Sequence, residues 1–283
     1  MDYKHILYQP GKVARIILNR PQFLNAQSYL MLEELNNTFL EAERDKGCGA
    51  IVLSGSGRSF CVGHDIGTDE DEKYKEQAGY TTNANMDISK WFEQMRKLYV
   101  EYTLNWRNLA KPTIAMVHGY CIFAGWMLAS AMDIVFSAED AQFLPGFTEY
   151  FSVPWDLSPR KAREILFEHR FITAREAHSY GFVNRVFPAG DLEKETLAYA
   201  ERVAENYLNN SSWVRFCKYS INHMEDSGGL STEISTAFNN FCLMTVTYAS
   251  ALASPEEGGF ARTKVAKKNL DLSMPWLRGS GLV

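Results

Sequence analysis

The feature that most constrains this fold is the alternation of strand-like and helix-like segments along residues 1–140. Apolar runs rich in β-branched residues at Val13–Leu18, Ala50–Leu53 and Thr113–Val117 are predicted to be strands. Between them, Tyr29–Glu43 and Ile88–Leu109 carry apolar residues at helical spacing. This order predicts parallel strands joined by right-handed crossovers, so the expected fold class is α/β.

The second half of the chain is predicted to be helical. Residues 1–200 are expected to form an α/β core, and residues 201–283 a C-terminal helical region used for oligomerisation. Leu230–Leu252 carries apolar or small residues around much of its circumference, so it is expected to be buried, with a subunit interface as one place for it. A polar insertion at Gly67–Asp87 is interpreted as a solvated loop or as a mobile cover over a nearby site.

Charge and composition exclude several classes of function. The net charge is −5 and no block of Lys or Arg stands out, which argues against nucleic acid as a partner. No run approaches the roughly 18 apolar residues of a membrane helix, and the N-terminus has no apolar leader. The cysteines lie far apart, without a Cys-x-x-Cys pair or a neighbouring histidine cluster. They are therefore expected to be reduced thiols in a cytoplasmic protein, with no metal site.

Two glycine-punctuated turns are the segments most informative about chemistry. Arg58–Ile66 follows a predicted strand, and Val117–Ala129 runs from a strand through a turn into a helix. Glycines at such corners let a ligand approach the backbone closely, and the first N–H groups of a helix lack internal partners. If the two turns face each other, two N–H groups can hold one thioester oxygen and stabilise it as its negative charge grows.

These segments, in this order, resemble the crotonase (enoyl-CoA hydratase/isomerase) superfamily over residues 10–268. The resemblance is carried by LNRP (18–21) with NA (25–26), AIVLSGSGRSFC (50–61), KPTIA (111–115), the second turn, and ITAREA (172–177) with GFVNRV (181–186). It implies a spiral of β-β-α turns followed by C-terminal helices used in trimer contacts. A homotrimer or a dimer of trimers is therefore expected.

The resemblance also implies a substrate and a set of site residues. The substrate is an acyl-CoA thioester, with no cofactor beyond its coenzyme A, and the oxyanion donors are the backbone N–H groups of His64 and Ala124. Arg262, Lys267 and Lys268, in a helix expected over Glu256–Lys268, are candidates for contacts with the CoA phosphates. The side chains expected to line the site are Cys61, Val62, Asp65, Ile66, Tyr120, Trp126 and Phe147. The alternative for Asp65 is a structural role in the turn, and the alternative for the aromatic residues is packing in the core.

The sequence departs from the resemblance where hydratases carry two glutamates. Met127 and Phe147 occupy the matching positions, so ordinary two-glutamate hydration is not expected. Glu149, beside aromatic residues, is the candidate acid/base, with a surface or helix-start carboxylate as the alternative. The His64 side chain is a candidate donor to the substrate, with an orientation toward solvent or CoA as the alternative. Asp156 is predicted to cap a helix rather than to act as a catalyst.

Three functions remain open from the sequence. The first is an enoyl-CoA hydratase/isomerase-like reaction, which the family resemblance favours. The second is hydrolysis (of the thioester or of a C–C bond) or decarboxylation through the same stabilised oxyanion. The third is a non-catalytic subunit that binds acyl-CoA or a partner chain.

Overall fold

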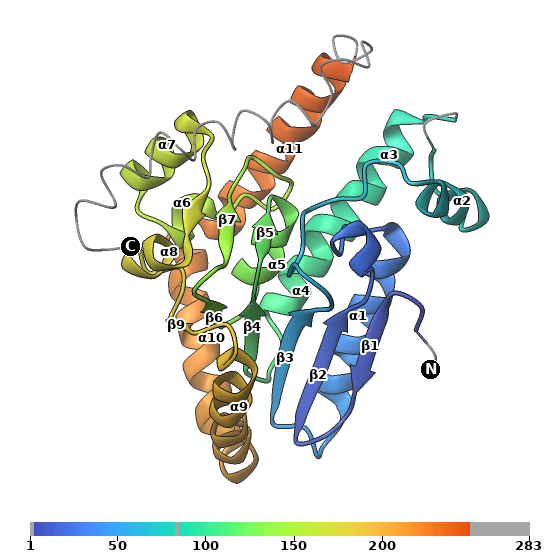
Figure 1. Ribbon diagram of the computed structural model, residues 1–283. Coiled ribbons are helices and arrows are strands. Elements are labelled where there is room, and N and C mark those ends of the chain that lie inside the picture. The colour runs from blue at the N-terminus through green and yellow to red at the C-terminus, as the bar shows by residue number, and fades with distance from the viewer. Residues whose placement is uncertain (1–2, 83–84, 250–283) are drawn as a thin grey trace.

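A six-stranded sheet organises the computed structural model, which describes residues 3–82 and 85–249 (Figure 1). Its first two strands pair antiparallel. All remaining neighbours in this sheet pair parallel, which is the arrangement that the sequence predicted. In spatial order the strands are β1 (Ile6–Gln9), β2 (Val13–Leu18), β3 (Ala50–Gly55), β4 (Thr113–Val117), β6 (Ile134–Ala138) and β9 (Arg185–Phe187).

In a second, three-stranded sheet, two strands directly follow strands of the first sheet, and the third follows a helix. This second sheet contains β5 (Tyr120–Ile122), β7 (Gln142–Leu144) and β8 (Ile172–Thr173). After β4 the chain turns into β5, and after β6 it turns into β7. Each of these strand pairs then leads into helix, which is the β-β-α spiral, so the expected fold class is confirmed.

The helices follow the predicted segments closely. The stretch predicted at Ile88–Leu109 forms as α3 and α4 joined by a π-helical turn, η2 (Arg96–Glu101). A short 3₁₀ turn, η1 (Pro21–Phe23), follows β2. The α-helices are α1 (Tyr29–Arg44), α2 (Asp69–Gln77), α3 (Ile88–Met95), α4 (Tyr102–Arg107), α5 (Ala124–Ser130), α6 (Val153–Asp156), α7 (Pro159–Glu168), α8 (Ala174–Ser179), α9 (Leu192–Asn209), α10 (Ser211–Ser227) and α11 (Leu230–Ala249).

Both faces of the large sheet are covered, which explains why its central strands β3 and β4 are buried along almost their whole length. Ile51 and Leu53 of β3 point into the main core, whereas Val52 between them packs in a second cluster with Leu192 and Ala200 of α9. The main core lies on the side of α1, and α9 covers the opposite face. The turns that follow β3 and β4 therefore emerge at one edge of a rigid, fully packed scaffold.

One expectation needs correction. Gly67–Asp87 is not simply a solvated loop, because it contains α2, and Asp71 in that helix is only 1% exposed. Helix α11 is buried on one side, through Ile234 and Phe238, as expected. Leu243 and Val246 are exposed in this single chain, and burial of that face at a subunit interface stays a prediction. The helix predicted at Glu256–Lys268 lies outside the described residues, together with the basic residues proposed to contact CoA phosphates. Within the described part of the chain, no helix combines the length and the apolar character needed to cross a bilayer.

Candidate active site

The two glycine-punctuated turns lie against each other. Cys61 and Cys121 form an isolated parallel β-bridge that joins them. Gly125 packs so closely that a Cβ atom on it would lie 2.3 Å from the carbonyl oxygen of Cys61. A Cβ atom on Gly63, whose φ is 102°, would lie 3.2 Å from the carbonyl oxygen of Ile122 in the second turn. Glycine at these two positions therefore lets the turns touch.

Two backbone N–H groups are left free where the turns meet. Ala124 is the first residue of α5, and His64 follows Gly63, whose φ is 102°. Neither N–H group donates a hydrogen bond to any residue that the structure describes. The residue before Ala124, Phe123, has the unusual φ of 49°, and its own N–H is held by Leu144 O at 2.8 Å. Such a backbone conformation costs energy and persists only when its surroundings fix it.

His64 and Glu149 form a buried pair beside these amides. His64 Nε2 lies 2.8 Å from Glu149 Oε2. The Glu149 side chain is completely buried, whereas 22% of the His64 side chain is exposed. The ring of Tyr99 packs edge-on against His64, with 4.1 Å between centroids, and burial raises the pKa of Tyr99 well above its usual value. Tyr99 is therefore uncharged at neutral pH and packs against the His64 ring.

The remaining polar atoms of the pair are unsatisfied. His64 Nδ1 and Glu149 Oε1 are both buried, and neither has a hydrogen-bond partner among the described residues. Buried polar atoms are normally paired, and exceptions often mark catalytic groups. The alternative of a surface carboxylate at Glu149 is therefore wrong, because the structure places this carboxylate in the interior.

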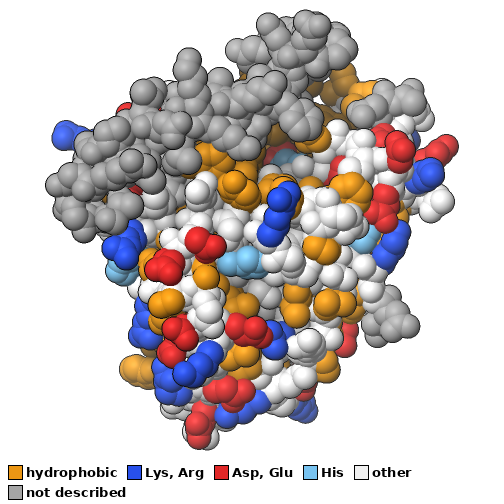
Figure 2. All heavy atoms as spheres, viewed as in Figure 1, with side chains coloured by type: hydrophobic (Ala, Val, Ile, Leu, Met, Phe, Trp, Pro, Cys, Tyr) orange, Lys and Arg blue, Asp and Glu red, His pale blue; other side chains and the backbone are white. Residues whose placement is uncertain are grey.

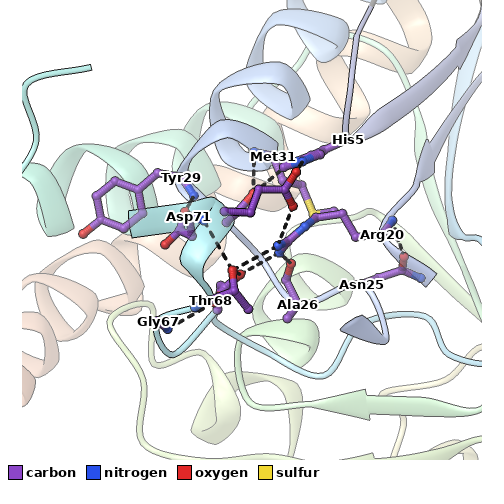
Figure 3. Close-up of polar contacts among 12 residues, drawn as sticks. His5, Arg20, Asn25, Ala26, Tyr29, Met31, Gly67, Thr68 and Asp71 are labelled. Atoms are coloured by element: carbon purple, nitrogen blue, oxygen red, sulfur yellow. Dashed lines mark hydrogen bonds and ion pairs between the residues drawn. The ribbon is translucent and has the colours of Figure 1, made fainter. Parts of the chain in front are cut away.

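Asp65, the residue after His64, is fully occupied by local structure. Its partners Arg20 and Thr68 lie side by side in Figure 3. Asp65 accepts hydrogen bonds from Thr68 and forms an ion pair with Arg20, whose Nη1 lies 2.8 Å from Asp65 Oδ2. Burial acts to raise the pKa of Asp65, but the hydrogen bonds from Thr68 and Arg20 lower it below its usual value. Arg20 also donates to Ala26 O at 2.7 Å and pairs with Glu70. The structure thus supports the turn interpretation of Asp65.

The aromatic residues predicted at the site divide into two groups. Trp126 is buried, stacks on Phe182 with 3.7 Å between centroids, and donates to Asp156 at 2.6 Å. Tyr120 and Phe147 are partly buried, and Phe147 packs against a neighbouring phenylalanine, Phe151. Trp126 therefore packs in the core, whereas Tyr120 and Phe147 keep part of their surface exposed.

The other predicted lining residues also differ in their surroundings. Cys61 lies inside the contact between the turns, and burial raises the pKa of its thiol to about 11, so the thiol is protonated at neutral pH. Val62 packs with Ile122 and Leu144 of the small sheet. Ile66 is 74% exposed and points away from this packing.

Asp156 does not cap a helix, contrary to the sequence prediction. The cap of α7 is Ser158, whose side chain accepts from Lys161 N. Asp156 instead ends α6 and accepts hydrogen bonds from Trp126, Ser130 and Ser152. Burial is the largest influence on this carboxyl group and raises its pKa to about 6. It joins α5 to α6 through these contacts.

Sequence reasoning missed two residues that hold the turns in place. Arg20 is completely buried and fixes Asp65, and Gln27, also buried, lies between the two turns. Their signal in the sequence was weak, because a polar residue near a predicted helix start is usually exposed. Only the contacts reveal that both are interior.

The molecule also has a groove that lies apart from the His64–Glu149 pair. This open groove of about 950 Å³ runs beside α2 and is lined by residues such as Lys4, Phe23 and Lys73, but not by His64 or Glu149. Among residues 3–82 and 85–249, no group of three His, Cys, Asp or Glu side chains is placed to hold a metal ion. One face of the molecule shows mixed charges below and a band of hydrophobic side chains higher up (Figure 2).

Comparisons with known proteins agree with the fold. The pattern of the enoyl-CoA hydratase/isomerase family matches residues 9–241. A putative enoyl-CoA hydratase of Mycobacterium tuberculosis, EchA13, is 34% identical over 255 residues, covering 84% of this chain and 79% of that protein. A probable peroxisomal enoyl-CoA hydratase of Arabidopsis thaliana is 30% identical over 70% of this chain and 71% of that protein. The crystal structure of a probable enoyl-CoA hydratase from Mycobacterium smegmatis superposes with a TM-score of 0.77 at 31% identity, covering 87% of this chain and 96% of that one.

Proposed function

Because the chain belongs to the enoyl-CoA hydratase/isomerase family of the crotonase superfamily, we propose that it transforms an acyl-CoA thioester through an enolate. The thioester oxygen accepts hydrogen bonds from the backbone N–H groups of His64 and Ala124. The observation that supports this most is that neither group has a hydrogen-bond partner among residues 3–82 and 85–249, and that both lie where the two turns pack against each other. Each such donor is worth roughly 3–4 kcal/mol of transition-state stabilisation.

The His64–Glu149 pair supplies the proton transfer. If His64 carries its proton on Nε2 and donates it to Glu149, the buried lone pair on Nδ1 has no partner among the described residues and acts as a base once the acyl group lies against it. His64 is the more exposed member, so it is the catalytic group that touches the substrate. Glu149 fixes the orientation of the ring and stabilises its positive charge after protonation.

One acid/base pair favours a double-bond shift over hydration. His64 takes a proton from the carbon next to the thioester, and the C–H electron pair moves into the dienolate. The imidazolium exchanges this proton with solvent and then delivers a proton to the γ-carbon. Hydration would in addition require a held and activated water, and the position that the family resemblance assigns to a glutamate is the buried Met127. Proton transfer changes no oxidation state, so no cofactor beyond the substrate's own coenzyme A is proposed.

Thioester hydrolysis is the second candidate, because a partly exposed histidine with a buried carboxylate behind it also suits the activation of water. In that reaction His64 takes a proton from water, and the hydroxide attacks the thioester carbon. The products are the free acid and free CoA. The same two backbone N–H groups would hold the tetrahedral oxyanion.

Isotope incorporation separates these outcomes. Purified protein is incubated with straight-chain, cyclic and aromatic enoyl-CoAs, once in D₂O and once in H₂¹⁸O, and the products are weighed by mass spectrometry. The proposal expects a shifted double bond with deuterium in the acyl chain and no ¹⁸O in the thioester. Addition of ¹⁸O to an intact thioester would establish hydration instead, and free CoA would establish hydrolysis. A panel that binds but never reacts would favour a non-catalytic subunit.

We also propose that the protein assembles as a homotrimer or a dimer of trimers. Helix α10 carries the exposed side chains of Trp213, Phe216 and Met224, and α11 that of Leu243, all on helices that follow the α/β core. Apolar groups of this size are usually covered by a partner. Light scattering after size-exclusion chromatography measures the mass, and a monomer would contradict the proposal.

A further inference from the structure

Gln27 contacts both turns of the candidate site at once. It is 1% exposed and lies just before α1. Its backbone N–H donates to Gly63 O at 2.8 Å, and its backbone carbonyl accepts from Asp65 N at 2.9 Å. Its side-chain Nε2 donates to Ala124 O at 2.8 Å. One residue is thus bonded to both segments that carry the free N–H groups.

On the side of the first turn, Gln27 controls the direction of the His64 amide. Gly63 O and His64 N belong to one planar peptide group, so fixing the oxygen also fixes the direction of the N–H bond. Accepting a hydrogen bond at the oxygen also polarises the same peptide group, which strengthens its N–H as a donor. The second bond, from Asp65 N, prevents this segment from rotating about the first.

On the side of the second turn, the contact comes from the side chain. Ala124 follows Phe123, whose strained backbone needs external restraint. The Gln27 amide supplies part of that restraint by holding the carbonyl oxygen of Ala124. Nε2 also lies 3.3 Å from Cys61 Sγ, so the amide group fills the space between the turns.

We propose that Gln27 is a positioning residue whose side-chain amide holds the Ala124 N–H in register with the His64 N–H. This inference rests on the proposed function, because it concerns the two oxyanion donors. It assigns a role that the backbone bonds of Gln27 alone cannot fill, since only its side chain reaches α5. Loss of the amide leaves the His64 side of the site intact and frees the Ala124 side.

The test substitutes Gln27→Met, which keeps the length of the side chain and all backbone bonds but removes the Nε2 donor. Acetoacetyl-CoA is the probe, because its enolate absorbs in the near ultraviolet and a site with two aligned donors favours that enolate. The bound enolate fraction is expected to fall at least about tenfold in the variant, since small misplacements at a reacting centre have effects of this size or larger. The Kd of saturated butyryl-CoA is expected to change less than about threefold, because that ligand forms no enolate.

Thr38→Val is the matched control. Thr38 is buried in α1 and its hydroxyl donates to Leu35 O, so this variant also loses one buried hydrogen bond but lies outside the site. Both variants are expected to lose similar thermal stability, and only Gln27→Met is expected to lose the enolate. A Gln27→Met protein with the wild-type enolate fraction would overturn the inference. A wild-type protein that forms no enolate would instead refute the oxyanion site, and the inference with it.

A second variant covers the case in which Gln27→Met does not fold. Gln27→Glu replaces the donor with a carboxylate, which repels the oxygen of Ala124 when ionised and donates to it when protonated. Its enolate fraction relative to wild type, compared at each pH, is therefore expected to recover as the pH falls. A constant ratio across pH would contradict the positioning role.

Discussion

Gly125→Ala tests whether the contact between the two turns is needed for function. The new Cβ atom would lie 2.3 Å from Cys61 O, and real Cβ atoms essentially never approach within 3.0 Å of another heavy atom. The turns must therefore separate by roughly 1 Å, and a displacement of this size at a reacting group costs about 100-fold in rate. The accompanying overpacking is expected to cost about 1–3 kcal/mol of stability, which a folded domain of this size tolerates.

The assay compares this variant with Gly190→Ala, in which the added Cβ atom meets nothing within 4 Å. For each protein, kcat on the active enoyl-CoA and the enolate of bound acetoacetyl-CoA are measured, with a melting curve to confirm folding. Gly190→Ala is expected to match wild type in all three measurements. A folded Gly125→Ala protein with turnover within threefold of wild type would refute the idea that close approach of the turns creates the site.

Three further predictions follow from particular contacts. Glu149→Gln is expected to lower kcat at least about 100-fold with little change in KM, because the imidazolium loses its buried counter-charge; a loss under threefold would make Glu149 structural. Asp156 binds its proton more tightly in the folded protein, where its pKa is about 6 against the usual 3.8. The stability of the wild type relative to Asp156→Asn is therefore expected to fall, by at most about 3 kcal/mol, as the pH rises from 4 to 6. A difference in unfolding free energy between the two proteins that stays constant over this range, measured by urea denaturation, would contradict this. Arg20→Met is expected to cost about 3–5 kcal/mol in urea denaturation because it leaves the Asp65 carboxylate buried without its cation, and a loss under 1 kcal/mol would show that water or other donors replace it.

Much of the fold was predictable because its signals are local. The apolar runs of β2, β3 and β4 and the periodicity of α1 each lie within one segment of sequence, and the structure forms them where predicted. Sequence reasoning passed over β1, β5, β8 and β9, which contain only two to four residues and are defined by their neighbours. A pattern so short carries too few side chains to show a period.

The interpretation of the polar insertion as a solvated loop failed for a related reason. Its high charge indicated a solvated loop, but Asp71 accepts a hydrogen bond from Tyr29 N and pairs with Lys75, which makes its burial tolerable. Charge along a segment shows its composition and does not show which of its charges find partners. The hydrogen bond from Tyr29 to Asp71 depends on a segment 42 positions away in the chain.

The sequence by itself determined that two glycine turns would follow parallel strands, and it identified His64, Ala124 and Glu149 as separate candidates. Only the tertiary structure decided that Glu149 is buried and lies 2.8 Å from His64, across 85 positions of sequence. It also decided that Gln27 lies between the turns. The physical reason is that backbone conformation follows from nearby residues, whereas burial and pairing of polar side chains depend on which distant segments the packed core brings together.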